Sequence, residues 1–95
     1  MKVLITGASS GIGKDMARIL GIKENELVLV ARDTEKLNNV KNEIEKAGTK
    51  VEVISMDLSN SENCISLHNM VQNVDILINN ARIWGLWKFH KNKFR

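Results

Sequence analysis

The chain has 95 residues, 43% of them hydrophobic and 26% charged, which is the composition of an ordinary water-soluble domain. Its single cysteine, Cys64, cannot form an internal disulfide, and this excludes a small disulfide-stapled scaffold. No apolar run is long enough to span a membrane and no signal-peptide pattern is present, so we expect a cytoplasmic protein.

Charge is distributed unevenly along the chain. Residues 1–81 contain nine Lys or Arg and all eleven Asp or Glu, whereas residues 82–95 contain five cationic side chains and no acid. All four aromatic residues also lie after position 81. This change in composition divides the chain into a predicted domain, 1–81, and a basic-aromatic tail, 82–95.

The first half of the chain begins with an apolar run and a glycine-rich turn. Residues 2–6 predict a buried strand, and glycines follow at positions 7, 11 and 13. Helical spacing predicts a helix over 12–21, with an apolar stripe made of Ile12, Met16, Ile19 and Leu20. The continuous apolar run at 27–31 is typical of a parallel strand that is covered on both faces.

The second half continues the alternation of strands and helices. Thr34 is the predicted N-cap of a helix over 35–47, whose inner face would comprise Leu37, Val40, Ile44 and Ala47. Residues 50–56 predict a third strand. Capping residues at 59–62 begin a third helix, on which lie Ile65, Leu67, His68 and Val71. Residues 74–78 predict a fourth strand.

The order β-α-β-α-β-α-β predicts an α/β fold, a parallel sheet with helices on both faces. The predicted strand order is 3-2-1-4. It leaves the strand at 74–78 as an open apolar edge, through which the protein could self-associate. In such a sheet a ligand binds outside the carboxyl ends of the strands, where the order reverses between the first and fourth strands.

Three segments at this predicted edge carry a resemblance to a known family. The family is the short-chain dehydrogenases/reductases, whose cofactor fingerprint resembles Thr6-Gly7-Ala8-Ser9-Ser10-Gly11-Ile12-Gly13. Its aspartate and apolar residue beside adenine resemble Asp57-Leu58, and its Asn-Asn-Ala-Gly turn resembles Asn79-Asn80-Ala81. The resemblance covers residues 1 to about 81. It implies a Rossmann-type doubly wound sheet, here truncated, that binds a nicotinamide dinucleotide.

The chemistry of phosphate binding explains the glycine turn. A pyrophosphate must approach backbone N–H groups at a helix N-terminus, where the helix dipole favours an anion. A Cβ at Gly11 or Gly13 would hold the backbone away from the phosphates or the helix away from the strand, and Gly7 permits a sharp turn. The candidate cofactor contacts here are Gly7, Ser9, Ser10, Gly11, Ile12 and Gly13. A glycine-rich turn without a nucleotide is the alternative.

Arg32 follows the second strand, at the position where such folds select their cofactor. An acid there would bond both ribose hydroxyls of NAD, whereas an arginine can pair with the 2′-phosphate of NADP. No carboxylate stands at the strand end itself, because Asp33 comes one residue later. The sequence therefore favours NADP over NAD, with a solvated surface charge as the alternative reading of Arg32.

The remaining candidate contacts follow the third and fourth strands. The Asp57 carboxylate can accept from the adenine amino group while a backbone N–H donates to a ring nitrogen, with Leu58 beside the ring; helix capping by Asp57 is the alternative. By the resemblance, Asn80 and Ala81 lie near the adenosine ribose, and side-chain amides tie the strand ends together. Arg82 stands where the family has glycine, and this departure affects the local path of the chain.

The resemblance implies hydride transfer between NADP(H) and a carbonyl or alcohol in full-length members of the family. The family's acid/base is the tyrosine of a Tyr-x-x-x-Lys motif, and this chain contains no tyrosine. We therefore assign no catalytic residue and expect no turnover by the chain alone. The alternative function is a truncated, non-catalytic nucleotide-binding or interaction module.

The tail at 82–95 is open to three interpretations. It can be the altered start of the next family segment, an unfolded end, or a basic-aromatic segment that binds an anionic surface. The last is the least favoured, and we expect no nucleic-acid partner. His68 stands alone on its predicted helix, where a structural role is more common than a catalytic one, and His90 has no Cys, His or acid partner nearby, so we expect no metal site.

Overall fold

The structure, a computed structural model, describes residues 1–80. Its elements in chain order are β1 (Lys2–Thr6), α1 (Gly11–Leu20), β2 (Glu26–Ala31), α2 (Thr34–Glu45), β3 (Lys50–Ser55), α3 (Ser61–Met70) and β4 (Ile76–Asn79). The predicted tail, together with the candidate contact Ala81, lies outside the described residues.

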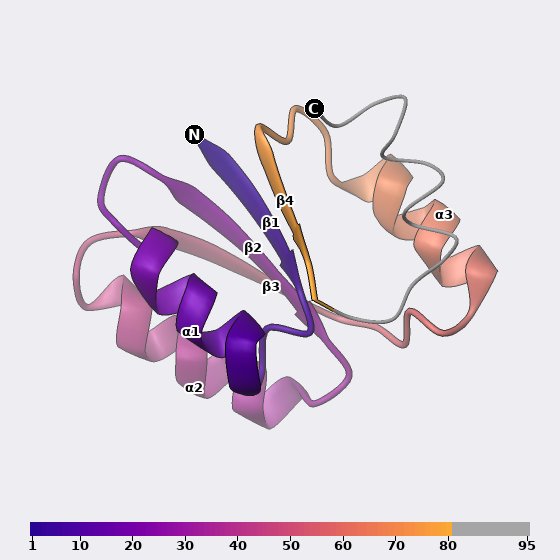
Figure 1. Ribbon diagram of the computed structural model, residues 1–95, viewed down its shortest axis with the longest axis horizontal. Helices are drawn as coiled ribbons and strands as arrows, with labels where there is room; N and C mark the ends of the chain where they lie inside the picture. Colours follow the sequence, from indigo (N-terminus) through magenta and orange to yellow (C-terminus); the bar gives the residue numbers. More distant parts are fainter. Residues whose placement is uncertain (81–95) are drawn as a thin grey trace.

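The four strands form one parallel sheet in the order β3-β2-β1-β4, as the sequence predicts. Val3 lies opposite Leu27 of β2 on one side and opposite Ile76 of β4 on the other. Figure 1 shows α1 and α2 together on one side of this sheet and α3 on the other. The carboxyl ends of all four strands therefore meet at one edge of a three-layer α/β fold, the doubly wound arrangement.

Two hydrophobic clusters hold the layers together, one on each face of the sheet. On the α1–α2 side the buried residues are Val3, Ile5, Ala8, Ala17, Leu27, Leu29, Leu37, Val40, Ile44 and Val51. On the α3 side they are Leu4, Val28, Val30, Ile54, Leu58, Cys64, Leu67, Val71 and Val74. Alternate side chains of β1 and β2 pack on opposite faces of the sheet. Because both faces are covered, the central positions of these strands are all apolar, and the sequence of each contains an unbroken apolar run.

The inner face of α1 differs from the predicted stripe. Ile12 and Ile19 are 69% and 67% exposed, whereas Gly13 and Ala17 are buried against the sheet. The prediction weighted side-chain size, but a helix that approaches a sheet closely needs small residues at the contact. Leu20 of the predicted stripe is partly buried and packs against the cluster on this side, whereas Ile12 and Ile19 project from the flank of the helix.

Several predicted boundaries shift by one or two residues. The N-cap of α2 is Asp33, whose side chain accepts from the amide of Lys36, so the assignment of the cap to Thr34 was wrong. A carboxylate at this position also complements the helix dipole. Ala47 lies in an exposed turn after α2, and β4 begins at Ile76, so Val74 is buried in the α3-side cluster ahead of the strand. Among residues 1–80, no helix has the length and apolar character needed to cross a membrane.

Candidate functional site

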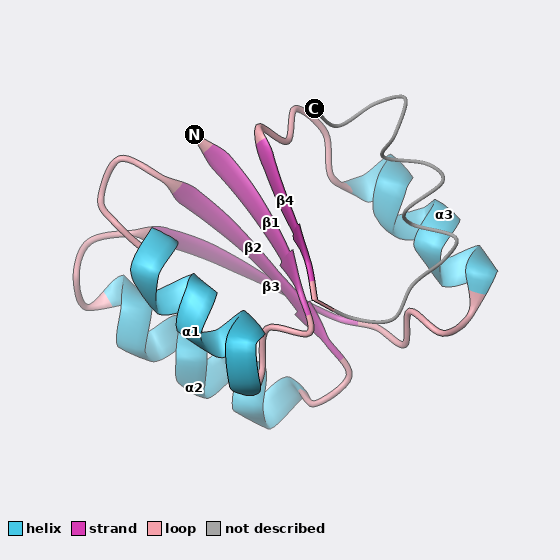
Figure 2. Ribbon diagram, in the orientation of Figure 1, coloured by secondary structure: helices cyan, strands magenta, loops and turns pink. Residues whose placement is uncertain are grey.

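The carboxyl edge of the sheet gathers the segments that the sequence singled out. The loops that follow β1, β2 and β3 and the residue that follows β4 all begin at this edge (Figure 2). Because the neighbours of β1 are β2 and β4, the glycine loop after β1 lies between the ends of those two strands. This is the place predicted for the ligand.

The glycine loop leaves β1 through a sharply turned backbone. Gly7 and Gly11 have φ values of 64° and 57°, in the left-handed region that strongly favours glycine. A Cβ built on Gly11 would meet no protein atom within 4 Å. Glycine is therefore favoured at position 11 by its backbone conformation and not by lack of space. No protein atom of the described residues occupies the position where a Cβ would lie.

Gly13 has a different role, because it lets α1 pack closely on the end of the sheet. A Cβ at this position would collide with the carbonyl oxygen of Gly7 and would lie 2.9 Å from Nδ2 of Asn80. The first turn of α1 thus lies directly against the end of β1 and the residue after β4. This agrees with the prediction that a side chain at Gly13 would separate the helix from the strand.

The amino end of α1 has no capping group from the protein. Its N-cap, Ser10, makes no side-chain hydrogen bond to the helix, and the first turn contains no acidic residue. By contrast, Asp33 and Asn60 cap α2 and α3 with their side chains, and each of those helices has a glutamate in its first turn. The free amides and positive dipole end of α1 therefore suit an anionic ligand.

A network of polar groups joins the ends of β1 and β4. Thr6, which is fully buried, places its hydroxyl 3.2 Å from Oδ1 of Asn79 and accepts from the amide of Asn80 at 3.1 Å. Nδ2 of Asn80 donates to the carbonyl of Gly7 at 3.4 Å. The predicted amide ties across this edge are confirmed. Thr6 was missed, although a polar residue that ends an apolar run before a glycine is a usable signal.

Arg32 lies at the end of β2 with its side chain exposed to solvent. Its carbonyl accepts from Oγ of Ser55 at 3.0 Å, which fixes the backbone beside the end of β3. Among residues 1–80, no hydrogen bond or ion pair engages the Arg32 guanidinium. The charge is close enough to Asp57 to contribute to lowering the pKa of that carboxyl. The guanidinium is thus available to an anion at the same edge as the glycine loop.

Asp57 is held in place by a residue that the sequence reading treated only as a helix cap. Oδ1 of Asp57 accepts from both the hydroxyl and the amide of Ser59, at 2.7 and 3.0 Å. These two bonds are the main reason that the pKa of Asp57 lies below its ordinary value, and nearby Arg32 adds to the effect. The D-x-S spacing is the signature of an Asx turn and could have identified this contact.

Leu58 turns its side chain away from the edge. It is buried in the α3-side cluster, and its carbonyl accepts from Sγ of Cys64 at 3.3 Å. Leu58 can therefore contact a ligand beside Asp57 only through its backbone. The helix that follows is capped by Asn60, so Asp57 is not the N-cap that the alternative reading supposed.

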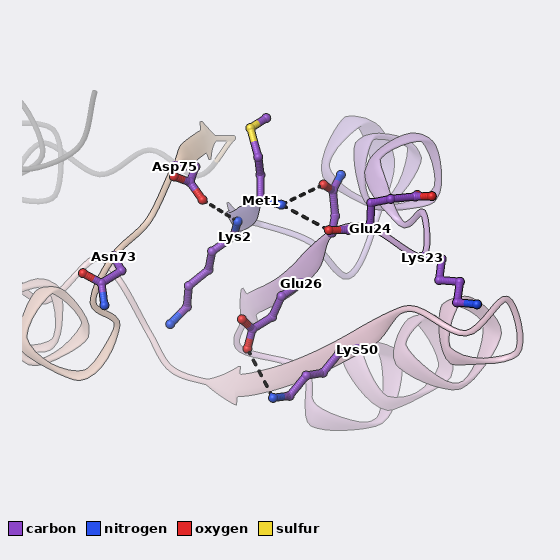
Figure 3. Close-up of a pocket in the computed structure, with 9 residues that line it drawn as sticks. Met1, Lys2, Lys23, Glu24, Glu26, Lys50, Asn73 and Asp75 are labelled. Atoms are coloured by element: carbon purple, nitrogen blue, oxygen red, sulfur yellow. Dashed lines mark hydrogen bonds and ion pairs between the residues drawn. The ribbon is translucent and has the colours of Figure 1, made fainter.

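The described residues also form a surface recess at the opposite, amino edge of the sheet (Figure 3). Its charged groups are partly engaged with one another. The N-terminal ammonium donates to the carbonyl of Glu24 at 3.2 Å and to Oδ1 of Asn25 at 3.3 Å, and Lys50 pairs with Glu26 at 3.8 Å. None of the candidate cofactor contacts lines this recess. Within residues 1–80 no cluster of His, Cys, Asp and Glu could hold a metal ion.

A parallel α/β sheet with a glycine turn, an uncapped helix end and an arginine after the second strand defines a dinucleotide-binding fold of the Rossmann type. The family profile described as short chain dehydrogenase matches residues 1–94, and the chain belongs to this family. The family assignment made from the sequence motifs is therefore confirmed.

Relatives and solved structures agree with this assignment. The chain is 40% identical over 80 residues to a 3-oxoacyl-(acyl-carrier-protein) reductase of Rickettsia prowazekii, an alignment that covers 84% of this chain and 32% of the relative. A metagenomic short-chain oxidoreductase solved with NADP matches with a TM-score of 0.81 and 41% identity, over 85% of this chain and 38% of the other. A short-chain dehydrogenase of Sphingobium yanoikuyae solved with NADPH matches with a TM-score of 0.77 and 37% identity, over 84% and 33%. The chain thus spans about a third of the length of the proteins that it matches.

Proposed function

We propose that residues 1–80 bind a nicotinamide dinucleotide across the carboxyl edge of the sheet. The observation that carries this proposal is the amino end of α1, whose amides have no protein cap and whose first turn has no acid. The pyrophosphate would accept from these amides, and Gly13 would keep the helix close to the end of β1. The loop contacts are those named from the sequence: Gly7, Ser9, Ser10, Gly11, Ile12 and Gly13.

The adenosine half of the cofactor would lie along the ends of β2, β3 and β4. Asp57, with one carboxylate oxygen engaged by Ser59, would accept from the adenine amino group through the other oxygen. Asn80 would border the ribose while its side chain holds Gly7, and Ala81 is proposed to follow it there. Two arguments support these proposed roles: the segments follow strands that end at the carboxyl edge of the sheet, and they resemble the family's motifs.

We propose NADP rather than NAD as the preferred cofactor. Arg32 is exposed, is engaged by no side chain among residues 1–80, and lies at the end of β2, where a 2′-phosphate would be placed. Two of the matched structures were solved with NADP or NADPH, which supports this choice by similarity.

For the full-length protein we propose hydride transfer between NADP(H) and a carbonyl or alcohol. When bound, the nicotinamide supplies the hydride chemistry. The residues of this chain bind and orient the cofactor, and they include no tyrosine to move the proton. This absence favours a second candidate for the 95-residue chain, a nucleotide-binding module without turnover. Saturable NADPH oxidation by the purified chain with a panel of ketones and aldehydes would exclude that second candidate.

Calorimetric titration of the chain with NADPH and NADH tests the proposal. We expect saturable binding of both, with NADPH tighter. Arg32→Ala should weaken NADPH binding by about 1.5–3 kcal/mol, because only the 2′-phosphate loses a charge-assisted bond, and NADH binding should change little. Lys23→Ala is the matched control, since Lys23 lies at the opposite edge of the sheet. Equal losses for the two cofactors would remove Arg32 from the site.

A further inference from the structure

The segment between β3 and α3 is held in place by side chains of α3. It leaves the carboxyl edge of the sheet and crosses to the α3 side of the molecule (Figure 1). Nδ2 of Asn63 donates to the carbonyl of Asp57 at 2.8 Å, and Sγ of Cys64 donates to the carbonyl of Leu58 at 3.3 Å. The side chain of Leu58 is itself buried in the α3-side cluster. Both peptide groups that flank Leu58 are therefore fixed by the helix.

The bond from Asn63 sets the direction of the Leu58 amide. The carbonyl of Asp57 and the N–H of Leu58 belong to one trans peptide group, in which the two point in opposite directions. Since the carbonyl points toward Asn63 on α3, the N–H points away from this helix. No hydrogen bond within residues 1–80 engages it. The backbone thus offers one fixed donor immediately after Asp57.

Ser59 fixes the carboxylate of Asp57 in a similar way. The hydroxyl and the amide of Ser59 both donate to Oδ1, and Oδ2 receives no hydrogen bond from residues 1–80. The pKa of Asp57 lies below its ordinary value, chiefly because of these bonds, so the carboxylate is ionised at neutral pH and can only accept. One oxygen is engaged by the protein, and the other remains as a fixed acceptor.

We propose that Oδ2 of Asp57 and the N–H of Leu58 form a pair that reads the base of the cofactor and selects adenine. Ser59 and Asn63 are the positioning residues of this pair. The inference rests on the proposed function and extends it to specificity. Adenine has an amino donor beside a ring-nitrogen acceptor, which complements the pair. Hypoxanthine has a carbonyl and an N–H at the same two positions, so an acceptor would meet Oδ2 and a donor would meet the N–H.

Selection of this kind depends on the orientation of both protein groups. If the peptide between Asp57 and Leu58 turned over, it would present a carbonyl to the base, and that carbonyl would accept from the N–H of hypoxanthine. The bond from Asn63 opposes this rotation. If the carboxylate rotated freely, neither oxygen would keep its direction toward the amino group. The two bonds from Ser59 oppose that motion.

Calorimetric titration with NADPH, and with the analogue in which hypoxanthine replaces adenine, tests the base-reading pair. We expect the 95-residue chain to bind NADPH about tenfold or more tightly than the analogue, because a hydrogen bond to a charged group is lost and two like groups oppose each other. Equal affinities, with saturable binding of NADPH, would overturn the pair and leave the proposed function standing. No binding of either dinucleotide would overturn both.

Ser59→Ala and Asn63→Ala test the positioning residues. Each should lower the preference for adenine about two- to tenfold, the effect of one hydrogen bond, mainly by weakening the binding of NADPH. Ser59→Thr retains a hydroxyl and should restore the preference. Ser66→Ala and Asn69→Ala are the matched controls, since both side chains are exposed on α3 and make no hydrogen bond within residues 1–80. They should leave both affinities unchanged.

The ratio of the two affinities separates positioning from a merely structural role. A loss of structure around the segment would weaken the binding of NADPH and of its hypoxanthine analogue alike, and the ratio would stay constant. A falling ratio in Ser59→Ala and Asn63→Ala, restored in Ser59→Thr, supports the proposal. An unchanged ratio in both alanine variants would overturn the assignment of Ser59 and Asn63 as positioning residues.

Discussion

The amino ends of the three helices offer a direct comparison, because all three helices begin near the carboxyl edge of one sheet. Those of α2 and α3 are closed by side chains of the protein, from Asp33 and Asn60, and each is followed by a glutamate. The amino end of α1 has neither a side-chain cap nor an acid. A side-chain cap commonly contributes about 0.5–2 kcal/mol, so the protein forgoes a stabilising contact at one helix only.

That difference supports the proposed position of the ligand. The capped helix ends already have an acceptor from the protein, whereas the uncapped end would gain one if the proposed anion bound there. The difference also separates nucleotide affinity from folding stability, two properties that one change at a binding site usually alters together. Changes at Ser10, the N-cap of α1, should alter nucleotide affinity more than stability, and changes at the N-caps Asp33 and Asn60 should do the reverse.

Gly13→Val should have the largest effect on this comparison. The new side chain would meet the Gly7 carbonyl and the Asn80 amide, so α1 would have to leave the end of the sheet. We expect loss of detectable nucleotide binding and a fall of about 1–3 kcal/mol or more in the free energy of unfolding, as for other overpacked sites. Urea unfolding and calorimetric titration measure the two effects.

Gly11→Ala is the matched control for that change. Position 11 has open space but a left-handed φ, so the cost should be about 1–2 kcal/mol from conformation alone. If Gly13→Val bound nucleotide as the parent chain does, the close packing of α1 would have no role in the site.

Ser10→Asp should convert the amino end of α1 into one like that of α2. The new carboxylate would cap the helix and occupy the place of the phosphates. We expect the affinity for NADPH to fall by about tenfold or more, because charge-assisted bonds are lost and an anion repels the ligand. The free energy of unfolding should stay the same or rise. A variant that binds NADPH with undiminished affinity would show that the phosphates lie elsewhere.

Asn60→Ala and Ser10→Ala form a matched pair for stability. Oδ1 of Asn60 accepts from the amide of Glu62 at 2.8 Å, so its loss should cost about 1 kcal/mol of unfolding free energy. Ser10 makes no such bond, and its replacement should cost much less. Both values come from urea unfolding under the same conditions. Equal losses would mean that Ser10 caps α1 in solution.

The smallest expected effect is the pH dependence contributed by Asp57. Its pKa is lower in the folded chain than in the unfolded one, chiefly through the two bonds from Ser59. The stabilisation is therefore present above the unfolded-state pKa of about 3.9 and is lost as the pH falls through the lower folded-state value. Asp57→Asn should make the unfolding free energy less steep in this acidic range. An unchanged pH profile would contradict the assignment.

The alternation of apolar runs and helical spacing predicted every element and the strand order, because burial on both faces leaves a strong trace in the sequence. It misjudged α1, where Gly13 and Ala17 make the contact and Ile12 and Ile19 do not. A helix can approach a sheet closely only where its side chains are small. A prediction based on large apolar residues does not detect such positions.

The parts of the candidate site that depend on one residue at a time could be predicted from the sequence. The turn at Gly7 and the close packing at Gly13 follow from properties of glycine, and the position of Arg32 follows from the end of the predicted strand. The contact between Thr6 and Asn80 was only partly predictable. It depends on which strands become neighbours in space, and that is decided by the whole sheet.

A second contact of Asn80, with Gly7, has a consequence for the order of events during synthesis. The hydrogen bond from Asn80 to Gly7 joins residues 73 positions apart, so the glycine loop leaves the ribosome long before its support exists. Non-local contacts of this kind also form late in folding, since a long loop must close first. Nucleotide capture would therefore report completion of the sheet, and a ribosome-bound chain should acquire it only once β4 has emerged and docked beside β1.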